Sequence, residues 1–91
     1  MVYVMLRSTV EAYEKWRPVF DSLEELRRSK GSKGVNHVFR DADNPNAITL
    51  ILEWDNADNA RKFLGSTELR EAMQRAGVVG APAVGAVLTS A

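Results

Sequence analysis

The sequence VNHVFRDADNPNAITLILEWD, running from Val35 to Asp55, decides the fold. Two runs rich in β-branched and aromatic residues, Val35–Arg40 and Ala47–Trp54, flank six residues in which Asp, Asn and Pro are concentrated. Asp and Asn side chains bond back to the local backbone and proline fixes φ, so this segment predicts a hairpin with a connection longer than two residues. The second run is apolar at both alternating sets of positions, which predicts a strand covered on both faces in the middle of a sheet.

The segment before the hairpin is predicted to form a strand and a long helix. Alternating apolar residues predict the strand over Val2–Arg7, and the Ser8–Glu11 segment fits a capping box that would begin the helix. The helix is expected to last to about Arg28, because apolar residues recur at three- and four-residue steps on both sides of Pro18. We expect the proline to bend this helix, since it removes one backbone hydrogen bond.

The segment after the hairpin is predicted to form a broken helix and a last strand. Asp55 and Asn56 offer N-caps for a helix through Leu64, and Ser66 offers a cap for a second helix, Thr67–Ala76. A loop at residues 80–82 and a strand over residues 83–89 would follow. The order strand, helix, strand, strand, broken helix, strand predicts one α+β domain over residues 1–91: a ferredoxin-like βαββαβ antiparallel sheet with its helices on one face.

The sheet face opposite the helices predicts a partner. Tyr3, Met5 and Ile51 would lie on that face, and an apolar patch of this size is unusual on a monomer. We therefore expect a homodimer in which the two sheets pack face to face.

Composition limits the possible classes of partner and compartment. The 91 residues carry a formal net charge of zero, and no field draws such a chain to nucleic acid or to a membrane surface. The basic residues around Gly31 are interpreted as cations that complement the end of a helix. The chain has no cysteine. The apolar run in its first residues is too short, and becomes polar too soon, for a signal peptide. We expect a cytoplasmic protein that binds neither nucleic acid nor a membrane.

Several segments resemble the dimeric α+β barrel superfamily, which includes the antibiotic-biosynthesis monooxygenase-like proteins and many small uncharacterised proteins. The segments are VYVMLRSTVEAYEKW from residue 2, VFRDADNPNAITLILEWDNADNARKFL from residue 38, and STELREAM from residue 66. The resemblance covers nearly the whole chain and implies a barrel of two sheets, with a pocket between the sheet and the helices of each subunit. No catalytic residue can be assigned from the resemblance, because the polar pocket residues of the cofactor-free oxygenases cannot be matched to this sequence position by position. The haem-degrading members carry an iron-binding histidine on a helix, and this chain has none there.

Four residues are candidates for the site. His37, the only histidine, could act as a general base or orient a ligand, or it could simply be a strand residue. Tyr13, Trp16 and Phe20 form an aromatic stripe that is usual for a core and would also suit the walls of an apolar pocket. His37 is therefore the candidate catalytic residue, and all four are candidate ligand-binding residues.

The charged side chains predict one buried pair and no metal site. Arg7 and Glu53 are expected to pair across the central strands. A lone histidine without cysteines cannot fill a metal's set of ligands. Neither strand-to-helix turn carries a glycine-rich phosphate loop, so we expect no cofactor and no metal.

Two classes of function fit these features. The first is a homodimeric small-molecule-binding protein or a cofactor-independent enzyme, monooxygenase- or cyclase-like, that acts on an apolar or aromatic metabolite. The second is a non-catalytic module, either a ligand-binding regulator or a structural dimer without a pocket. An enzyme needs a cavity with converging polar groups, whereas a structural dimer needs none.

Overall fold

A computed structural model gives the architecture of the chain and describes residues 1–79 and 85–91. The elements in chain order are β1 (Val2–Val10), α1 (Tyr13–Ser22), α2 (Glu24–Lys30), β2 (Ser32–Arg40), β3 (Ala47–Trp54), α3 (Ala57–Leu64), α4 (Thr67–Arg75) and β4 (Val78–Thr89). The loop predicted at residues 80–82 lies outside the described residues.

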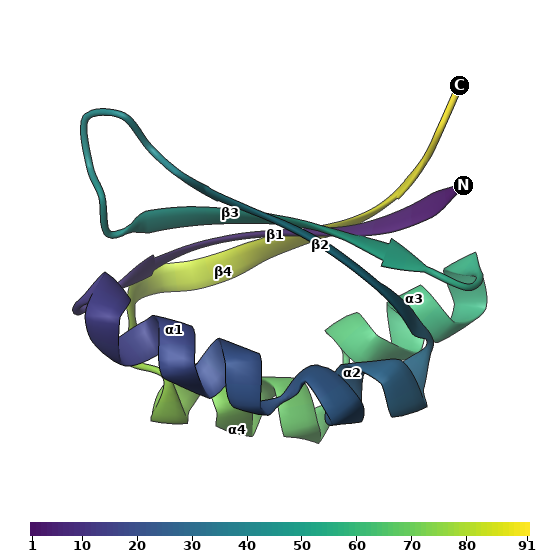
Figure 1. Cartoon of the computed structure of the whole chain (residues 1–91), viewed down its shortest axis with the longest axis horizontal. Helices are drawn as coiled ribbons and strands as arrows, with labels where there is room; N and C mark the ends of the chain where they lie inside the picture. Colours follow the sequence, from purple (N-terminus) through teal and green to yellow (C-terminus); the bar gives the residue numbers. More distant parts are fainter.

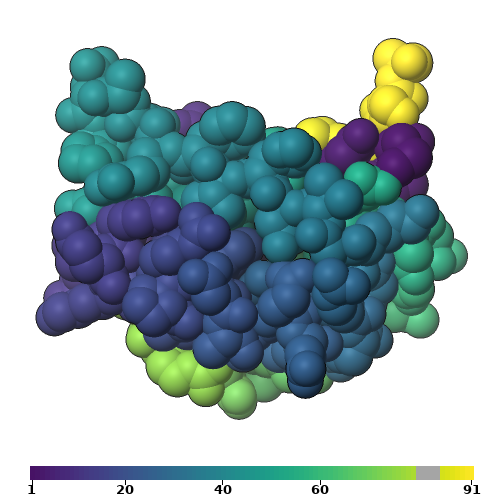
Figure 2. Space-filling view, viewed as in Figure 1, coloured from purple at the N-terminus to yellow at the C-terminus, as the bar shows by residue number. Residues whose placement is uncertain are grey.

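The strands form one antiparallel sheet in the order β2-β3-β1-β4, and the four helices lie on one face of it (Figure 1). The predicted ferredoxin-like βαββαβ fold is thus confirmed, with the first and third strands in the centre. β3 has the predicted bounds, and its Ile48, Leu50, Leu52 and Trp54 are buried beneath the helices. In the space-filling view, α1 and α2 form a continuous surface below β2 (Figure 2).

The predicted capping box at Ser8–Glu11 is wrong, because β1 continues to Val10. Ser8 pairs with Ile48 along β3, and the Val10 N–H donates to the carbonyl of Asn46 at 2.9 Å. Pairing with the full length of β3 therefore replaces the local cap. α1 begins after Ala12, whose side chain makes no capping hydrogen bond. Asn46 Oδ1 accepts instead from the first N–H of the helix, that of Tyr13, at 3.3 Å.

The predicted single helix is divided at Leu23 rather than bent at Pro18. Pro18 lies within α1, and Leu23 separates α1 from α2 with φ −101° and ψ 13°. Side chains bind two carbonyls beside the break: the Ser22 hydroxyl donates to Val19 O at 2.7 Å, and Arg27 Nη1 donates to Phe20 O at 2.7 Å. Phe20 O also accepts from the backbone N–H of Leu23 at 3.2 Å. Such side-chain donors make the division stable.

Trp54 joins the sheet to two helices and is 1% exposed. Its ring centroid lies 4.5 Å from that of Phe63 in α3, and its Nε1 donates to Lys30 O at the end of α2 at 3.0 Å. Gly31 follows with φ +123°, a conformation that favours glycine, and a Cβ there would come within 2.6 Å of Trp54 Nε1. Trp54 therefore holds α2 and α3 to the end of β3.

The helices after β3 begin at the predicted caps. Asn56 Oδ1 accepts from Asn59 N at 2.8 Å at the start of α3, and Ser66 Oγ accepts from Leu69 N at 3.2 Å at the start of α4. These bonds satisfy N–H groups that the first helical turn leaves free. Within the described residues, no helix is long and apolar enough to span a membrane.

The sheet face away from the helices carries large exposed apolar side chains. Val35 and Phe39 of β2 are 42% and 53% exposed, and Val79 and Leu88 of β4 are 40% and 39% exposed. Between them lie half-buried residues of the central strands, which alternate with the buried core positions: Tyr3, Met5 and Ile51. We call this surface, formed by Tyr3, Met5, Val35, Phe39, Ile51, Val79 and Leu88, the open sheet face.

Candidate functional site

A cavity of about 70 Å³ lies between the helices and the sheet. Its walls come from β1, β3, β4 and all four helices, and they are mostly apolar side chains. Among the described residues the polar side chains that line it are those of Ser8, Arg27 and Glu68. An apolar cavity of roughly 150 Å³ accommodates benzene, so an aromatic ligand needs some lining side chains to move outward. Met73 in α4, an unbranched and flexible side chain, is one lining residue able to do so.

Trp16 and Phe20 of α1, two residues of the aromatic stripe, line this cavity. Both are buried, and their rings stack with centroids 5.0 Å apart and an angle of 20° between the planes. The stripe thus serves as core and as cavity wall at once.

Tyr13, the third residue of the stripe, lies outside the described walls of the cavity. Its ring centroid is 5.8 Å from that of Trp16, and the guanidinium carbon of Arg40 lies 4.0 Å above its ring. Its hydroxyl accepts from Arg17 Nη1 at 3.1 Å. Tyr13 therefore connects α1 to the hairpin at the end of the stripe.

His37 lies on the opposite side of the sheet from the cavity. It pairs with Ile51 on β3, its side chain is exposed, and its ring centroid is 6.4 Å from that of Phe39. Side chains alternate along a strand, and the neighbouring Val38 packs against the core, so His37 must face outward. The structure brings Trp16 and Phe20 together in one cavity and separates His37 from both.

The predicted pairing of Arg7 with Glu53 is wrong because of the strand register. Arg7 lies opposite Thr49, whereas Glu53 lies opposite Tyr3. The Arg7 guanidinium forms an ion pair with Asp41 at 3.5 Å instead, on the open sheet face.

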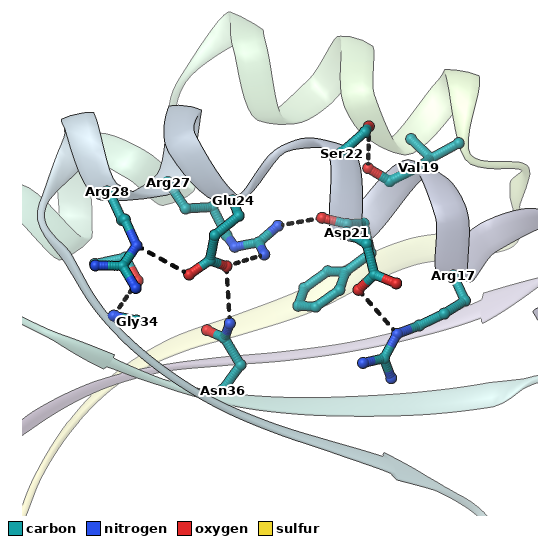
Figure 3. Close-up of polar contacts among 11 residues, drawn as sticks. Arg17, Val19, Asp21, Ser22, Glu24, Arg27, Arg28, Gly34 and Asn36 are labelled. Atoms are coloured by element: carbon teal, nitrogen blue, oxygen red, sulfur yellow. Dashed lines mark hydrogen bonds and ion pairs between the residues drawn. The ribbon is translucent and has the colours of Figure 1, made fainter.

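Glu24 holds a polar cluster at one end of the cavity (Figure 3). Its carboxylate accepts from Arg27 Nη2 at 2.7 Å, Asn36 Nδ2 at 2.9 Å and Arg28 Nε at 3.2 Å. Arg27 is 5% exposed, and its guanidinium carbon lies 3.9 Å above the ring centroid of Phe20. This cluster was not predicted from the sequence. The spacing of Glu24 to Arg27 and Arg28 was a visible signal, but the burial of Arg27 depends on the division at Leu23.

The environment of Glu24 changes its acidity. Burial disfavours its charged form, but hydrogen bonds from Arg27 and Asn36, the charge of Arg27 and a hydrogen bond from Arg28 outweigh that effect and hold the pKa of Glu24 below its usual range. A glutamate in an unfolded chain takes up its proton near pH 4.3, at about the ordinary value for this side chain. The folded protein thus gains stability from ionised Glu24 at pH values above this point.

Acidification should therefore destabilise the protein in part through Glu24. Because its pKa is lower in the folded state, this contribution is present above about pH 4.3 and is lost as the pH falls through the lower folded value. Urea unfolding of the wild type and Glu24→Gln between pH 6 and 3 checks this. We expect the difference in free energy of unfolding between the two proteins to shrink as the pH falls. A constant difference would contradict it.

The described residues hold no group of three or more His, Cys, Asp or Glu side chains that could bind a metal.

Comparison with solved structures gives the fold relatives of this chain. A protein from Bordetella bronchiseptica, provisionally described as an antibiotic biosynthesis monooxygenase, superimposes with a TM-score of 0.77 at 16% identity, over 99% of this chain and 96% of its own. SnoaB from Streptomyces nogalater, described as a cofactor-independent oxygenase, gives 0.74 at 18% identity, over 99% and 92%. Rv0793 from Mycobacterium tuberculosis gives 0.69 at 18% identity, over 99% and 94%.

These likenesses confirm the predicted resemblance at the level of the fold. No protein-family model matches the chain. No curated protein matches it in sequence either.

Proposed function

We propose that this chain is a homodimeric protein that binds a small apolar or aromatic metabolite in the cavity between its helices and its sheet. The observation that carries the proposal is the cavity itself, which is lined by the stacked rings of Trp16 and Phe20. Ligand sites are usually concave and mostly apolar, with a small number of polar groups that orient the ligand. A purely structural dimer has no need for such a space.

Naphthalene is a suitable probe for this proposal, because it is aromatic and uncharged. The two indole N–H resonances of the protein provide an internal control: Trp16 lines the cavity, whereas Trp54 Nε1 is bonded to Lys30 O. Titration should shift the Trp16 resonance more than that of Trp54. The variant Ala72→Leu, which fills part of the cavity from α4, should weaken binding at least tenfold. Unchanged spectra at saturating naphthalene would overturn the proposal.

The homodimer rests on the open sheet face. The helices cover the other face of the sheet and leave this one without a layer of its own chain. Stable dimers commonly bury about 800 Å² of surface on each partner. Val35 and Phe39 expose large apolar side chains at its β2 edge. A second copy is the occupant that this face suits, since an isologous contact pairs the apolar patch with itself.

A charge placed on the open sheet face should separate the dimer. Wild-type protein at micromolar concentration is expected to sediment at twice the 10.1 kDa chain mass, and Phe39→Asp is expected to sediment as a monomer. Phe39 is half exposed in the single chain, so this change has little effect on folding itself. Lys62→Asp, an exposed charge reversal on α3, is the matched control and should remain dimeric. A monomeric wild type, or a dimeric Phe39→Asp, would contradict the interface.

A second candidate function is cofactor-independent monooxygenase-like catalysis at the same cavity. The observation in its favour is the fold shared with SnoaB, which is described as a cofactor-independent oxygenase. Such a reaction must take its electrons from the substrate: an activated CH2 group and O2 give C=O and water. Oxygen uptake with 2-tetralone, an aromatic ketone with an activated methylene group, distinguishes catalysis from binding alone. Trp16→Phe, which keeps a ring in the cavity wall, is the variant to compare.

A further inference from the structure

Arg27 is the least exposed charged side chain in the described part of the protein, and it lines the cavity. Arginine is rarely buried to this extent unless its charge and its N–H groups find partners. Two of its nitrogens have acceptors: Nη1 donates to Phe20 O and Nη2 donates to Glu24 Oε2, both at 2.7 Å. Its Nε–H is buried and has no acceptor among the described residues.

The carboxylates near Arg27 are already engaged by other cations within the described residues. Glu24 is the carboxylate that contacts Arg27, and it also binds Arg28 at 3.2 Å. Among the described residues Glu24 does not line the cavity, and the carboxylate that does, that of Glu68, is paired with Lys30 at 2.7 Å. The Glu24 carboxylate is thus shared between two guanidinium groups, and of these two arginines only Arg27 lines the cavity.

We propose that the Arg27 end of the cavity binds an anionic oxygen, such as a carboxylate, carried by the aromatic or apolar ligand. This inference rests on the proposed function, because it assigns the polar group of the ligand that occupies the same cavity. The ring of the ligand would lie against Trp16 and Phe20, and its carboxylate would accept from the free Nε–H of Arg27. A charge-assisted bond of this kind is among the stronger hydrogen bonds in proteins.

Access to Arg27 requires the same movement as ligand entry. The Nε–H has no contact with solvent, so a carboxylate reaches it after the apolar side chains that cover it move aside. A cavity of about 70 Å³ imposes such a movement on any aromatic ligand. Asn36 Oδ1 is also buried without a described partner, but Asn36 does not line the cavity. A water molecule bridging these two atoms is the competing explanation.

The test compares 2-naphthoate with naphthalene at pH 7. A carboxylate is more strongly hydrated than a hydrocarbon, so an apolar cavity alone would favour naphthalene. We expect 2-naphthoate to bind about tenfold more tightly or better, which is the range of a hydrogen bond to a charged group. It should also move the Nε–H proton resonance of Arg27 downfield in a ¹H–¹⁵N spectrum, as a new carboxylate acceptor does, whereas naphthalene offers no acceptor and should cause no such downfield shift.

Variants assign the effect to one side chain. Arg27→Met should lose the preference for 2-naphthoate and still bind naphthalene. Arg17→Met is the matched control, because Arg17 also lies over the Phe20 ring, at 5.7 Å, but is not in the described cavity wall; it should keep the preference. If Arg27→Met does not fold, the affinity ratio and the Arg27 resonance of the wild type decide the question.

Two results would overturn the inference, and they differ in what they imply. Binding of naphthalene without a preference for 2-naphthoate and without a downfield shift of the Arg27 resonance would reject the anion site, favour a bridging water, and leave the proposed function intact. Binding of neither probe would reject both the anion site and the proposed function.

Discussion

Replacement of Trp54 by alanine is expected to lower the free energy of unfolding by about 3–5 kcal/mol, the range for removal of a fully buried large aromatic side chain. Trp54 is 1% exposed at the end of β3, and its ring packs on Phe63. The truncation would also leave Lys30 O at the end of α2 without its indole donor. The sheet, α2 and α3 would lose the side chain that all three contact. Three elements held by the rest of the fold cannot easily move together to fill the space left by the indole ring.

Trp54→Phe is the matched variant for this prediction. It keeps an aromatic ring against Phe63 and removes the Nε1–H, so it should cost about 1–2 kcal/mol, as expected for one unsatisfied carbonyl and a smaller ring. Urea unfolding followed by circular dichroism measures both variants. Equal losses for Trp54→Ala and Trp54→Phe would show that the hydrogen bond, not the packing, holds the two helices to the sheet.

Removal of the Glu24 carboxylate is expected to destabilise the protein by about 3 kcal/mol. Glu24→Ala leaves the buried guanidinium of Arg27 without its counter-charge and Asn36 Nδ2 without its acceptor. Breaking one side of a buried ion pair is costly, because the remaining charge stays out of water. Urea unfolding at pH 7 measures this loss.

Asp21→Ala provides the control in the neighbouring helix. Asp21 forms the same type of pair, with Arg17 Nε at 3.0 Å, but the two side chains are 58% and 40% exposed. Exposed pairs contribute about 0–1 kcal/mol, so this variant should unfold almost like the wild type. Similar losses in free energy of unfolding for Glu24→Ala and Asp21→Ala would mean that the pair of Glu24 with Arg27 contributes no more to stability than an exposed pair.

Much of the fold could be predicted because local and long-range preferences agree. The β3 run is apolar at both alternating positions and has the predicted bounds, and α3 and α4 begin at Asn56 and Ser66, whose side chains cap them. The start of α1 could not be predicted, because the sequence around Ser8 suits a cap and a strand equally, and pairing with β3 decides between them.

The site was predicted in part for a related reason. The aromatic stripe is a property of one helix, so Trp16 and Phe20 follow from their spacing. The face of the sheet on which His37 lies follows from the strand register, which involves β3 as well as β2. The burial of Arg27 depends on the division at Leu23, whereas the sequence predicted a single helix bent at Pro18. Features that need two elements to be placed correctly were therefore the ones missed.

The central position of β1 has a consequence for the order of folding. β1 pairs on one side with β3 and on the other with β4, so Val2 lies opposite Trp54 and also opposite Thr89. During synthesis, β1 can pair with β3 long before β4 leaves the ribosome, and its second edge stays unpaired until then. Unpaired edges of this kind favour aggregation, and contacts between distant residues slow folding. Nascent chains that stall before β4 should therefore be the species most dependent on chaperones.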